Sequence, residues 1–585
     1  MKMTTKTGTR TTMAERRLMA RRNPSSFPLL CTMVVASLAF PSVDDTLAAS
    51  TVLLFPEGGE SWAIDSYHLV RWNPEQLGNA PKISASYSTD DGETWTKISR
   101  VGLSPSRGVL RWKIPGPPAK RVQLRISNSS SGDTVSNTTP FEIIPSQAVN
   151  NYQWHKVTQK ATFAARDGAG SLTFKNRMFL LGGWNPASKR QFPMVCNNEV
   201  WSSVTGKDWV LVKKNTHLDR HFDRNSDWEG RHTAGYVVYR NKMWLVGGDA
   251  NQGHYQSDIW NSADGRTWKQ VNHGLPAPWS PRVLHHTVVF QDKIWVMGGQ
   301  TMPAFAPARE VFYRDIWTTT DGKTWTEVKP REPFWSRRGM IGGGVVFGGR
   351  LWILGGGTYD TPTTKVRKYH NDVWSSDDGV HWKNHTTQAP WPERQYHHVT
   401  VYDDRMWVLA GYRSVDRNDA WYSSDGTNWY QQFGTSWQAR HAASVFVHDK
   451  SLWIAAGSCM SRDVWRLRRS RDPLYRSPRE PVPLAWVDVL LHGLNDRRGF
   501  TYDKKNPNGS PNALGLQKET PVDVMIYSRQ FGVNFLGDEG RNHYADLKVM
   551  ESGDVEFVKW RDGGHPHTIT VDNRTRPRRI TIEKQ

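Results

Sequence analysis

Cysteine is scarce in this chain, with three residues among 585. Cys31 lies close to the N-terminus, which leaves Cys196 and Cys459 in the rest of the sequence. Two cysteines exclude a disulfide framework of the kind that holds small secreted domains together. A single bridge between them and a pair of free thiols both stay open.

Long apolar runs are also missing beyond the N-terminus. Mean hydropathy is −0.64, and no later apolar run reaches the roughly 18 residues that a membrane-spanning helix needs. We therefore expect no membrane span in the mature chain. The beginning differs, because seven basic residues precede an apolar stretch at 27–40 and small residues that end at Ala48. This order predicts a signal peptide over residues 1–49 and a secreted or periplasmic protein.

Acidic residues are fewer than basic ones, at 56 against 76, so the net charge is +20. Residues 1–48 hold seven of the bases and three of the acids, and the mature chain keeps +16. Such an excess favours acidic partners, for example anionic polysaccharides or cell-surface polymers, although a solvated basic surface is an equal alternative. No nucleic-acid motif is present, so no nucleic-acid partner is expected.

A short apolar strand that ends in two small residues recurs six times. The strand ends are Leu180-Leu-Gly-Gly183, Leu245-Val-Gly-Gly248, Val296-Met-Gly-Gly299, Ile353-Leu-Gly-Gly356, Val408-Leu-Ala-Gly411 and Ile454-Ala-Ala-Gly457. A third strand with an acid two places before a tryptophan follows each of them: Glu199-Val-Trp201, Asp258-Ile-Trp260, Asp315-Ile-Trp317, Asp372-Val-Trp374, Asp419-Ala-Trp421 and Asp463-Val-Trp465. A tight glycine turn then leads to a fourth strand that begins with tryptophan in five units.

The sixth unit stops after its third strand, and Gln153-Trp-His-Lys-Val157 supplies the missing one from before the first unit. Residues 151–468 therefore predict a β-propeller of six four-stranded blades, closed by residues 152–157. Paired glycines followed by a tryptophan-bearing strand resemble the kelch repeats of the galactose oxidase central-domain-like superfamily. Ala410 and Ala456 depart from that pattern. The resemblance implies an all-β fold with a six-bladed kelch propeller.

Strands are also expected on both sides of the propeller. Alternating apolar residues and frequent turns over residues 50–146 predict a β-sandwich. The phrases Pro56-Glu-Gly-Gly-Glu-Ser-Trp62 and Tyr67-His-Leu-Val-Arg-Trp72 resemble immunoglobulin-like modules of secreted proteins. Residues 469–482 read as a linker, and strand-like runs over 483–585 predict a small β domain of unknown type.

An arginine follows an aromatic residue by three positions at the start of every unit. The arginines are Arg166, Arg231, Arg282, Arg338, Arg394 and Arg440, and the aromatic residues are Phe163, Trp228, Trp279, Trp335, Trp391 and Trp437. The first strand of a propeller blade lines the channel, so these residues predict an arginine ring walled by aromatic faces, suited to a sugar with a carboxylate. The alternative is structural, since kelch blades use an arginine at this place to tie neighbouring blades, and a tryptophan can pack between them.

Histidine pairs follow two of these arginines, at His285-His286 and His397-His398. Because alternate residues of a strand face opposite sides, one of each pair is expected to face the channel. His286, His398 and Tyr396 are therefore candidate ligand-binding residues. Tyr396-His397 also resembles an inner strand of copper-radical oxidases, but the cysteine which that family requires is missing from residues 167–174. No cofactor or metal is expected.

No acid pair, nucleophile–base set or complete metal site emerges from the sequence. The sequence favours a non-catalytic binding or scaffolding module over an enzyme, with a glycan or an extracellular protein as partner. The alternative is an acidic-sugar enzyme similar to a sialic-acid mutarotase. A sialidase or a copper-radical oxidase has less support.

Overall fold

The computed structural model describes residues 52–584, except 78–79, 100–101, 138, 219–221, 251–253, 302–309, 340–341, 359–367, 414, 495–498, 504–515, 517–518, 538–540 and 562–565. The expected signal peptide lies outside these residues. Regular structure in the described residues is strand throughout, apart from the short 3-10 helices η1 (Pro74–Leu77) and η2 (Pro105–Arg107). The all-β class is therefore confirmed.

The described residues contain no helix long and apolar enough to cross a membrane.

Two sheets with one shared core form the N-terminal part. One sheet has the order β1 (Leu53–Phe55), β3 (Tyr67–Trp72), β6 (Val109–Lys113). The other has the order β2 (Ser61–Ala63), β9 (Phe141–Ile144), β7 (Ala119–Asn128), β4 (Ile83–Ser88), β5 (Thr96–Lys97), with β8 (Thr134–Ser136) beside β7. Inward residues of both sheets, such as Trp72 and Phe141, belong to a single buried cluster.

Six four-stranded antiparallel sheets follow in the chain. The first contains β11 (Gly170–Phe174), β12 (Arg177–Leu181), β13 (Val200–Ser203) and β14 (Val210–Lys213). The second contains β15 (Gly235–Tyr239), β16 (Lys242–Ala250), β17 (His254–Ser262) and β18 (Lys269–Gln270). The third contains β19 (His286–Phe290), β20 (Lys293–Met297), β21 (Ile316–Thr319) and β22 (Thr326–Val328).

The fourth sheet contains β23 (Gly344–Phe347), β24 (Arg350–Gly357), β25 (Tyr369–Ser376) and β26 (Lys383–Thr386). The fifth contains β27 (His398–Tyr402), β28 (Arg405–Leu409), β31 (Ala420–Ser423) and β32 (Tyr430–Gln432), and a small hairpin, β29 (Tyr412–Arg413) with β30 (Val415–Asp416), lies in its loop. The sixth contains β33 (Ser444–His448), β34 (Ser451–Ala455), β35 (Val464–Arg469) and β10 (Tyr152–Thr158).

Local sequence accounts for the first hairpin of each sheet. The two strands are joined by a two-residue turn with positive φ at both residues, the geometry that matches strand twist. These turns are Lys175-Asn176, Arg240-Asn241, Gln291-Asp292, Gly348-Gly349, Asp403-Asp404 and Asp449-Lys450. In five sheets the tryptophan of the second strand donates its indole N–H to a carbonyl five residues earlier, as Trp244 does to Tyr239 (2.9 Å).

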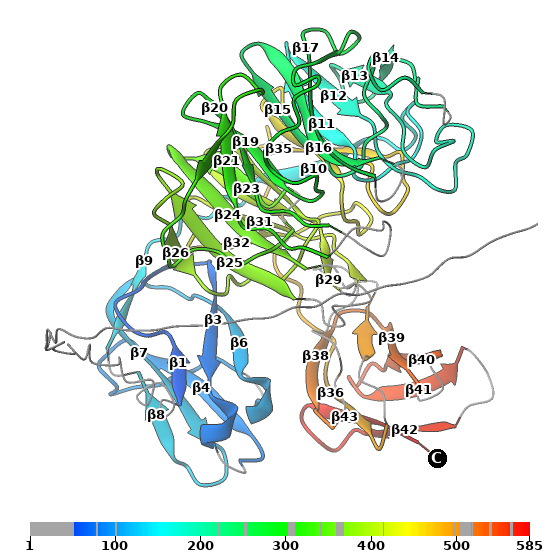
Figure 1. Ribbon diagram of the computed structural model, residues 1–585. Helices are drawn as coiled ribbons and strands as arrows, with labels where there is room; N and C mark the ends of the chain where they lie inside the picture. The colour runs from blue at the N-terminus through cyan, green and yellow to red at the C-terminus, as the bar shows by residue number, and fades with distance from the viewer. Residues whose placement is uncertain are drawn as a thin grey trace, which may run out of the picture. The chain divides into compact units, whose positions relative to one another are not determined.

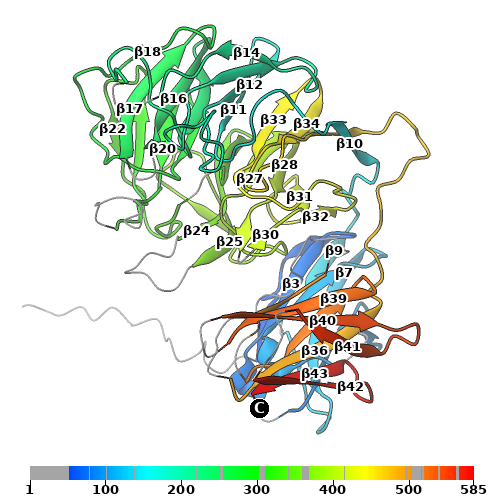
Figure 2. The same cartoon turned by 90° about the vertical axis from the view of Figure 1, so that its right-hand side faces the viewer.

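The six sheets form a closed, propeller-like arrangement (Figures 1 and 2). The first strands contact one another in the order β11, β15, β19, β23, β27 and β33, and β33 contacts β11 again. Large apolar side chains fill the space between adjacent sheets, as Trp244 and Trp279 do between the second and third. The six first strands therefore surround a central channel.

The sixth sheet joins the two ends of this arrangement. Tyr152 pairs with Arg469, Trp154 with Leu467 and Lys156 with Trp465 in an antiparallel register. The predicted pairing of residues 152–157 with the last third strand is therefore confirmed, and the paired segment extends two residues beyond Leu467.

The C-terminal part has two four-stranded sheets around its own core. The first has the order β38 (Val522–Ile526), β36 (Ala485–His492), β43 (Arg578–Lys584), β42 (His567–Asp572). The second has the order β37 (Gly499–Tyr502), β39 (Gln530–Leu536), β40 (Asn542–Val549), β41 (Val555–Trp560). The strand-like runs predicted from the sequence, at 486–491, 522–527, 554–560, 567–572 and 579–583, match β36, β38, β41, β42 and β43, but none was predicted at β37, β39 or β40.

Candidate binding site in the central channel

The six predicted arginines are enclosed in the protein rather than facing the channel. Each is at most 1% exposed, and each meets the carboxylate two places before the third-strand tryptophan of its own sheet. The pairs are Arg166 with Glu199, Arg231 with Asp258, Arg282 with Asp315, Arg338 with Asp372, Arg394 with Asp419 and Arg440 with Asp463. The expectation of an accessible arginine ring at the channel mouth is therefore wrong.

In the Arg394–Asp419 pair, the guanidinium and the carboxylate satisfy each other's hydrogen-bonding groups. Two guanidinium nitrogens of Arg394 reach the two carboxylate oxygens at 2.5 and 2.6 Å, and a third N–H donates to the Pro392 carbonyl. The indole of Trp421 donates to the same carboxylate at 2.8 Å. Burial raises the pKa of Asp419, but Arg394 outweighs it, so the pKa lies below its usual 3.8.

The backbone carbonyls of the same arginines tie neighbouring sheets together. The second small residue of each strand-two end donates its N–H to the arginine carbonyl of the next sheet. The bonds run from Gly183 to Arg231, Gly248 to Arg282, Gly299 to Arg338, Gly356 to Arg394, Gly411 to Arg440 and Gly457 to Arg166, at 2.7–3.2 Å. The last bond joins the sixth sheet to the first, so the series closes on itself.

The five tryptophans of the candidate set are buried in the same way. Trp228, Trp279, Trp335, Trp391 and Trp437 are at most 2% exposed. Each packs in a cluster between two adjacent sheets, and Trp391 lies edge-on to Trp429 at 5.8 Å. A ligand could not stack on these rings without opening the sheets, so their predicted role as aromatic walls is also wrong.

Backbone hydrogen bonds link neighbouring sheets around one end of the channel, which we call the neck. The residue two places after the arginine has positive φ in five sheets, at Gly168, Thr233, Leu284, Tyr396 and Ala442. Their N–H groups bond around the channel, from Gly168 to Ala442, from Thr233 to Gly168 and from Ala442 to Tyr396. Tyr396 packs there with Leu284 and lies 5.2 Å from the His441 ring. Tyr396 is thus part of this neck.

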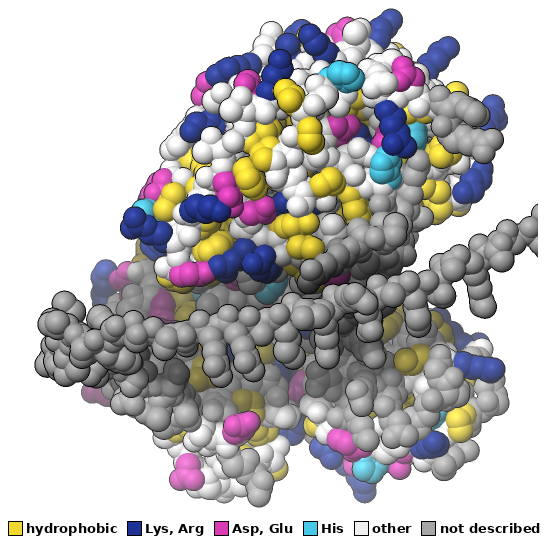
Figure 3. Space-filling model, viewed as in Figure 1, with side chains coloured by type: hydrophobic (Ala, Val, Ile, Leu, Met, Phe, Trp, Pro, Cys, Tyr) yellow, Lys and Arg dark blue, Asp and Glu magenta, His cyan; other side chains and the backbone are white. Residues whose placement is uncertain are grey.

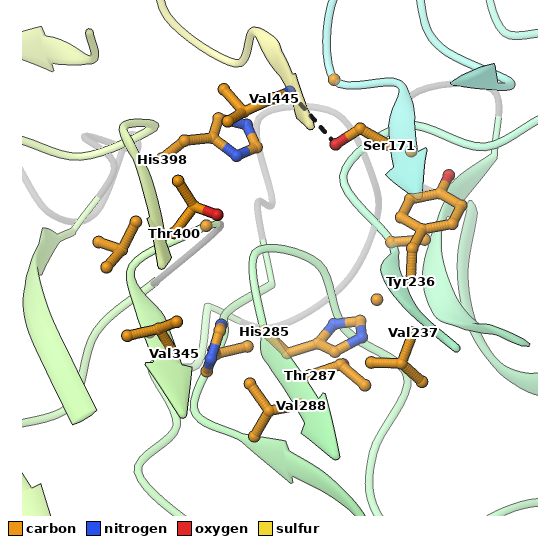
Figure 4. Close-up of a pocket in the computed structure, with 18 of the residues that line it drawn as sticks. Ser171, Tyr236, Val237, His285, Thr287, Val288, Val345, His398, Thr400 and Val445 are labelled. Carbon is orange, nitrogen blue, oxygen red and sulfur yellow. Dashed lines mark hydrogen bonds between the residues drawn. The ribbon is translucent and has the colours of Figure 1, made fainter. Parts of the chain in front are cut away.

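The channel beyond the neck contains a cavity of about 390 Å³ (Figure 4). The first strands of all six sheets line it, and several lining positions are glycine. A side chain at Gly344 would overlap the His286 ring, and one at Gly170 would overlap Tyr236. Glycine at these places therefore lets side chains of adjacent sheets lie flat against the wall. None of the described residues that line the cavity is Asp, Glu, Lys or Arg.

The two members of each histidine pair make different contacts, although His285 borders the cavity as well as His286 and His398. His285 and His397, the first of each pair, donate from Nε2 to the carbonyls of Val246 and Leu354 in the preceding sheet, at 3.0 and 2.9 Å. His286 and His398, the second of each pair, line the cavity, and Figure 4 shows His398 projecting into it.

The imidazoles of His286 and His398 carry no charge except at acidic pH. Burial lowers the pKa of His286 to about 3 and that of His398 to about 4, from a usual 6.5. A neutral imidazole both donates and accepts a hydrogen bond, so each histidine can serve a hydroxyl group of a ligand.

Four polar atoms of residues that line the cavity are buried and have no hydrogen-bond partner in the described residues. They are the Tyr236 hydroxyl, Nδ1 of His285, Nε2 of His286 and Oγ1 of Thr287. Such groups cost free energy when buried unless something else binds them. His286 was among the predicted residues, whereas Tyr236 and Thr287 were not. Tyr236 follows Gly235 at the start of its first strand, but Thr287 stands between His286 and Val288 and carries no comparable signal.

No disulfide joins Cys196 to Cys459, so the structure does not contain the bridge that the sequence left open. A scan against protein-family models gives no match, and no curated protein matches the chain.

Proposed function

We propose that this chain is an exported binding module, a six-bladed kelch-type propeller preceded by an immunoglobulin-like domain, and that it holds a neutral sugar in its central channel. The closed series of glycine-to-arginine hydrogen bonds supports the kelch assignment. The observation that carries the binding role is the set of unpartnered polar atoms on Tyr236, His286 and Thr287 around an uncharged cavity. The volume of about 390 Å³ lies within the usual range for small-molecule sites.

A neutral sugar suits this cavity better than an acidic one. Hydroxyl groups can donate to His286 and accept from Tyr236 and Thr287, which matches both kinds of unsatisfied group. A carboxylate would lose hydration and meet no cation on the described lining, which is unfavourable. The arginines that first suggested an acidic ligand are already paired with carboxylates.

The acidic-sugar enzyme gains no specific support. Acid–base catalysis on a sugar uses a carboxylate or a titrating histidine near the reacting atoms. The described cavity lining contains no carboxylate, and its histidines titrate well below neutral pH. We therefore retain the non-catalytic function.

Two tyrosines of strand β15 provide the test. Tyr236→Phe removes a hydroxyl with no partner in the described protein, so it should leave the melting temperature unchanged and weaken sugar binding by about tenfold. Tyr239→Phe is the matched control, because its hydroxyl donates to the Asp292 carbonyl at 2.7 Å. This control should lower the melting temperature and leave binding intact.

The measurement is a screen of neutral and acidic glycans, followed by calorimetry on any hit. Equal binding by the wild type and Tyr236→Phe would exclude the channel as the site. Hits confined to acidic glycans would contradict a neutral ligand in the channel.

A further inference from the structure

A second hollow lies on the propeller-like part, at the edge of the sixth sheet. Its volume is about 600 Å³. The turn of the β33–β34 hairpin and the end of β35 form most of its wall, and Tyr402 and Asp403 of the fifth sheet complete it. We call this hollow the β35 cleft. It is separate from the channel cavity, because the two share no lining residue.

The cleft is strongly cationic. Five cationic side chains line it, Lys450, Arg466, Arg468, Arg469 and Arg471, against the carboxylates Asp403 and Asp449. This concentration of cationic side chains differs from the face shown in Figure 3, where Lys and Arg side chains of the propeller-like part are scattered among acidic and hydrophobic ones.

Most of this charge is not neutralised within the protein. Asp403 is bound by Arg469 at 2.8 Å and also by Arg405. Arg466, Arg468 and Arg471 form no ion pair with any described residue. The Nε atoms of Arg466 and Arg468 are buried and have no hydrogen-bond partner there.

The three arginines also act on one another. Burial lowers the pKa of Arg466, and the charges of Arg468 and Arg471 lower it further, while Asp449 opposes them. Burial together with Arg468 and Arg466 likewise lowers the pKa of His155, which pairs with Arg466 on the adjacent strand. Like charges held this close repel, and an external anion would relieve that repulsion.

We propose that the β35 cleft binds an extended acidic polysaccharide, through its carboxylate or sulfate groups. Arg466 and Arg468 lie on the same face of β35, separated by buried Leu467 and therefore by about 6.6 Å along the strand. Arg471, beyond the end of β35, lines the same cleft, and several cations in one cleft suit a chain with repeated charges better than one small anion. Guanidinium forks bind planar carboxylate and tetrahedral sulfate groups with two hydrogen bonds each.

A single-stranded nucleic acid fits the cleft less well. Proteins that bind such strands place aromatic rings under the bases. The one aromatic residue in the described cleft lining is Tyr402, which is 7% exposed. The cleft therefore presents charge without a stacking surface.

The test uses the full mature chain with four probes: polygalacturonate, heparin, neutral dextran and polyglutamate. Binding to polygalacturonate alone assigns carboxylate groups, and binding to heparin alone assigns sulfate groups. Arg466→Gln with Arg468→Gln should weaken the bound polysaccharide by at least tenfold and reduce the salt dependence, by about one power of the salt concentration for each arginine–anion pair removed. Arg190→Gln with Arg574→Gln is the control, since it removes the same charge from exposed positions elsewhere.

Arg466 is half-buried and lies over the Trp453 ring, so the double variant could lose stability. Arg471→Gln avoids this difficulty, because Arg471 is exposed, and it should still weaken binding severalfold. Equal binding to dextran, equal loss in the control variant, or polyglutamate binding as tight as polygalacturonate would overturn the proposal. Tyr236→Phe should leave polysaccharide binding unchanged, which separates this site from the channel.

Discussion

At the scale of single residues, one structural unit recurs in all six sheets. A buried arginine, a carboxylate and an indole N–H of the third strand meet in each sheet, as Arg282, Asp315 and Trp317 do. Burial alone would make such charges costly, but in each unit the arginine is paired with a carboxylate that also accepts the indole N–H. The unit holds the loop before the first strand to the third strand of the same sheet.

Removing one member of this unit should destabilise the protein severely. Arg394→Ala leaves the Asp419 carboxylate buried without its cation, and we expect a loss of about 3–5 kcal/mol in the free energy of unfolding. Arg413→Ala is the control, because its pair with Glu393 is partly exposed and should contribute less than about 1 kcal/mol. Calorimetric melting of both variants checks this. A normal melting temperature for Arg394→Ala would show that the pair is dispensable.

At the scale of strands, we expect the stability of the six-sheet ring to depend on β10, the strand that closes it. Deleting residues 152–157 exposes the edge of β35 and uncovers the apolar faces of Trp465 and Leu467. We expect the melting temperature to fall markedly. A synthetic peptide of residues 150–159 should restore part of the loss, and a scrambled peptide should not. Full stability of the deletion variant would contradict this role of β10.

The strands themselves could be predicted from sequence because their markers are local. Paired small residues, tight turns and strand-leading tryptophans each reflect the geometry of one hairpin. The burial of Arg394 could not be predicted in this way, because it depends on Asp419, which is 25 residues away. A signal was nevertheless present, since an acid stands two places before the third-strand tryptophan in every unit. The arginine and the acid recur together because they pair.

The candidate site was predicted only in part, because it too depends on residues that are far apart in the sequence. Strand alternation predicted that His286 and His398 reach the cavity, but it did not predict that His285 borders it too. It could not show that Tyr236 and Thr287 lie in the same cavity, because that depends on which glycines of the adjacent sheets leave room for them. The cationic cleft was not predicted from the sequence. Arg466 and Arg468 alternate with apolar residues, which is the ordinary pattern of a half-buried strand.

At the scale of the whole molecule, buried histidines should make stability depend on pH. Burial lowers the pKa of His285 and His398 to about 4 and that of His286 and His397 to about 3. The unfolded chain takes up protons below about pH 6.5, whereas the folded protein does not. The free energy of unfolding should therefore fall as the pH is lowered from 6.5 towards 4, by up to about 1.4 kcal/mol per pH unit for each histidine.

Melting temperatures measured between pH 7.5 and 4.5 test this expectation. Carboxylates such as Asp419 have lowered pKa values. Their contribution to the free energy of unfolding is therefore complete above pH 3.8 and does not change in this range. His397→Gln keeps an N–H donor for the Leu354 carbonyl but cannot titrate, and it should flatten the dependence. A melting temperature that stays constant over the whole range would rule out the histidines as its source.

The register of β10 against β35 has a mechanical consequence. The chain enters the sixth sheet at Tyr152 and leaves it at Arg469, and these two residues are directly paired. Tension applied between the two flanking segments would therefore act on one end of the ladder and open its hydrogen bonds one after another, instead of loading them all together in shear. The closure that should dominate resistance to heat is then the first part to yield to force, so single-molecule pulling should open this sheet at low force before any other.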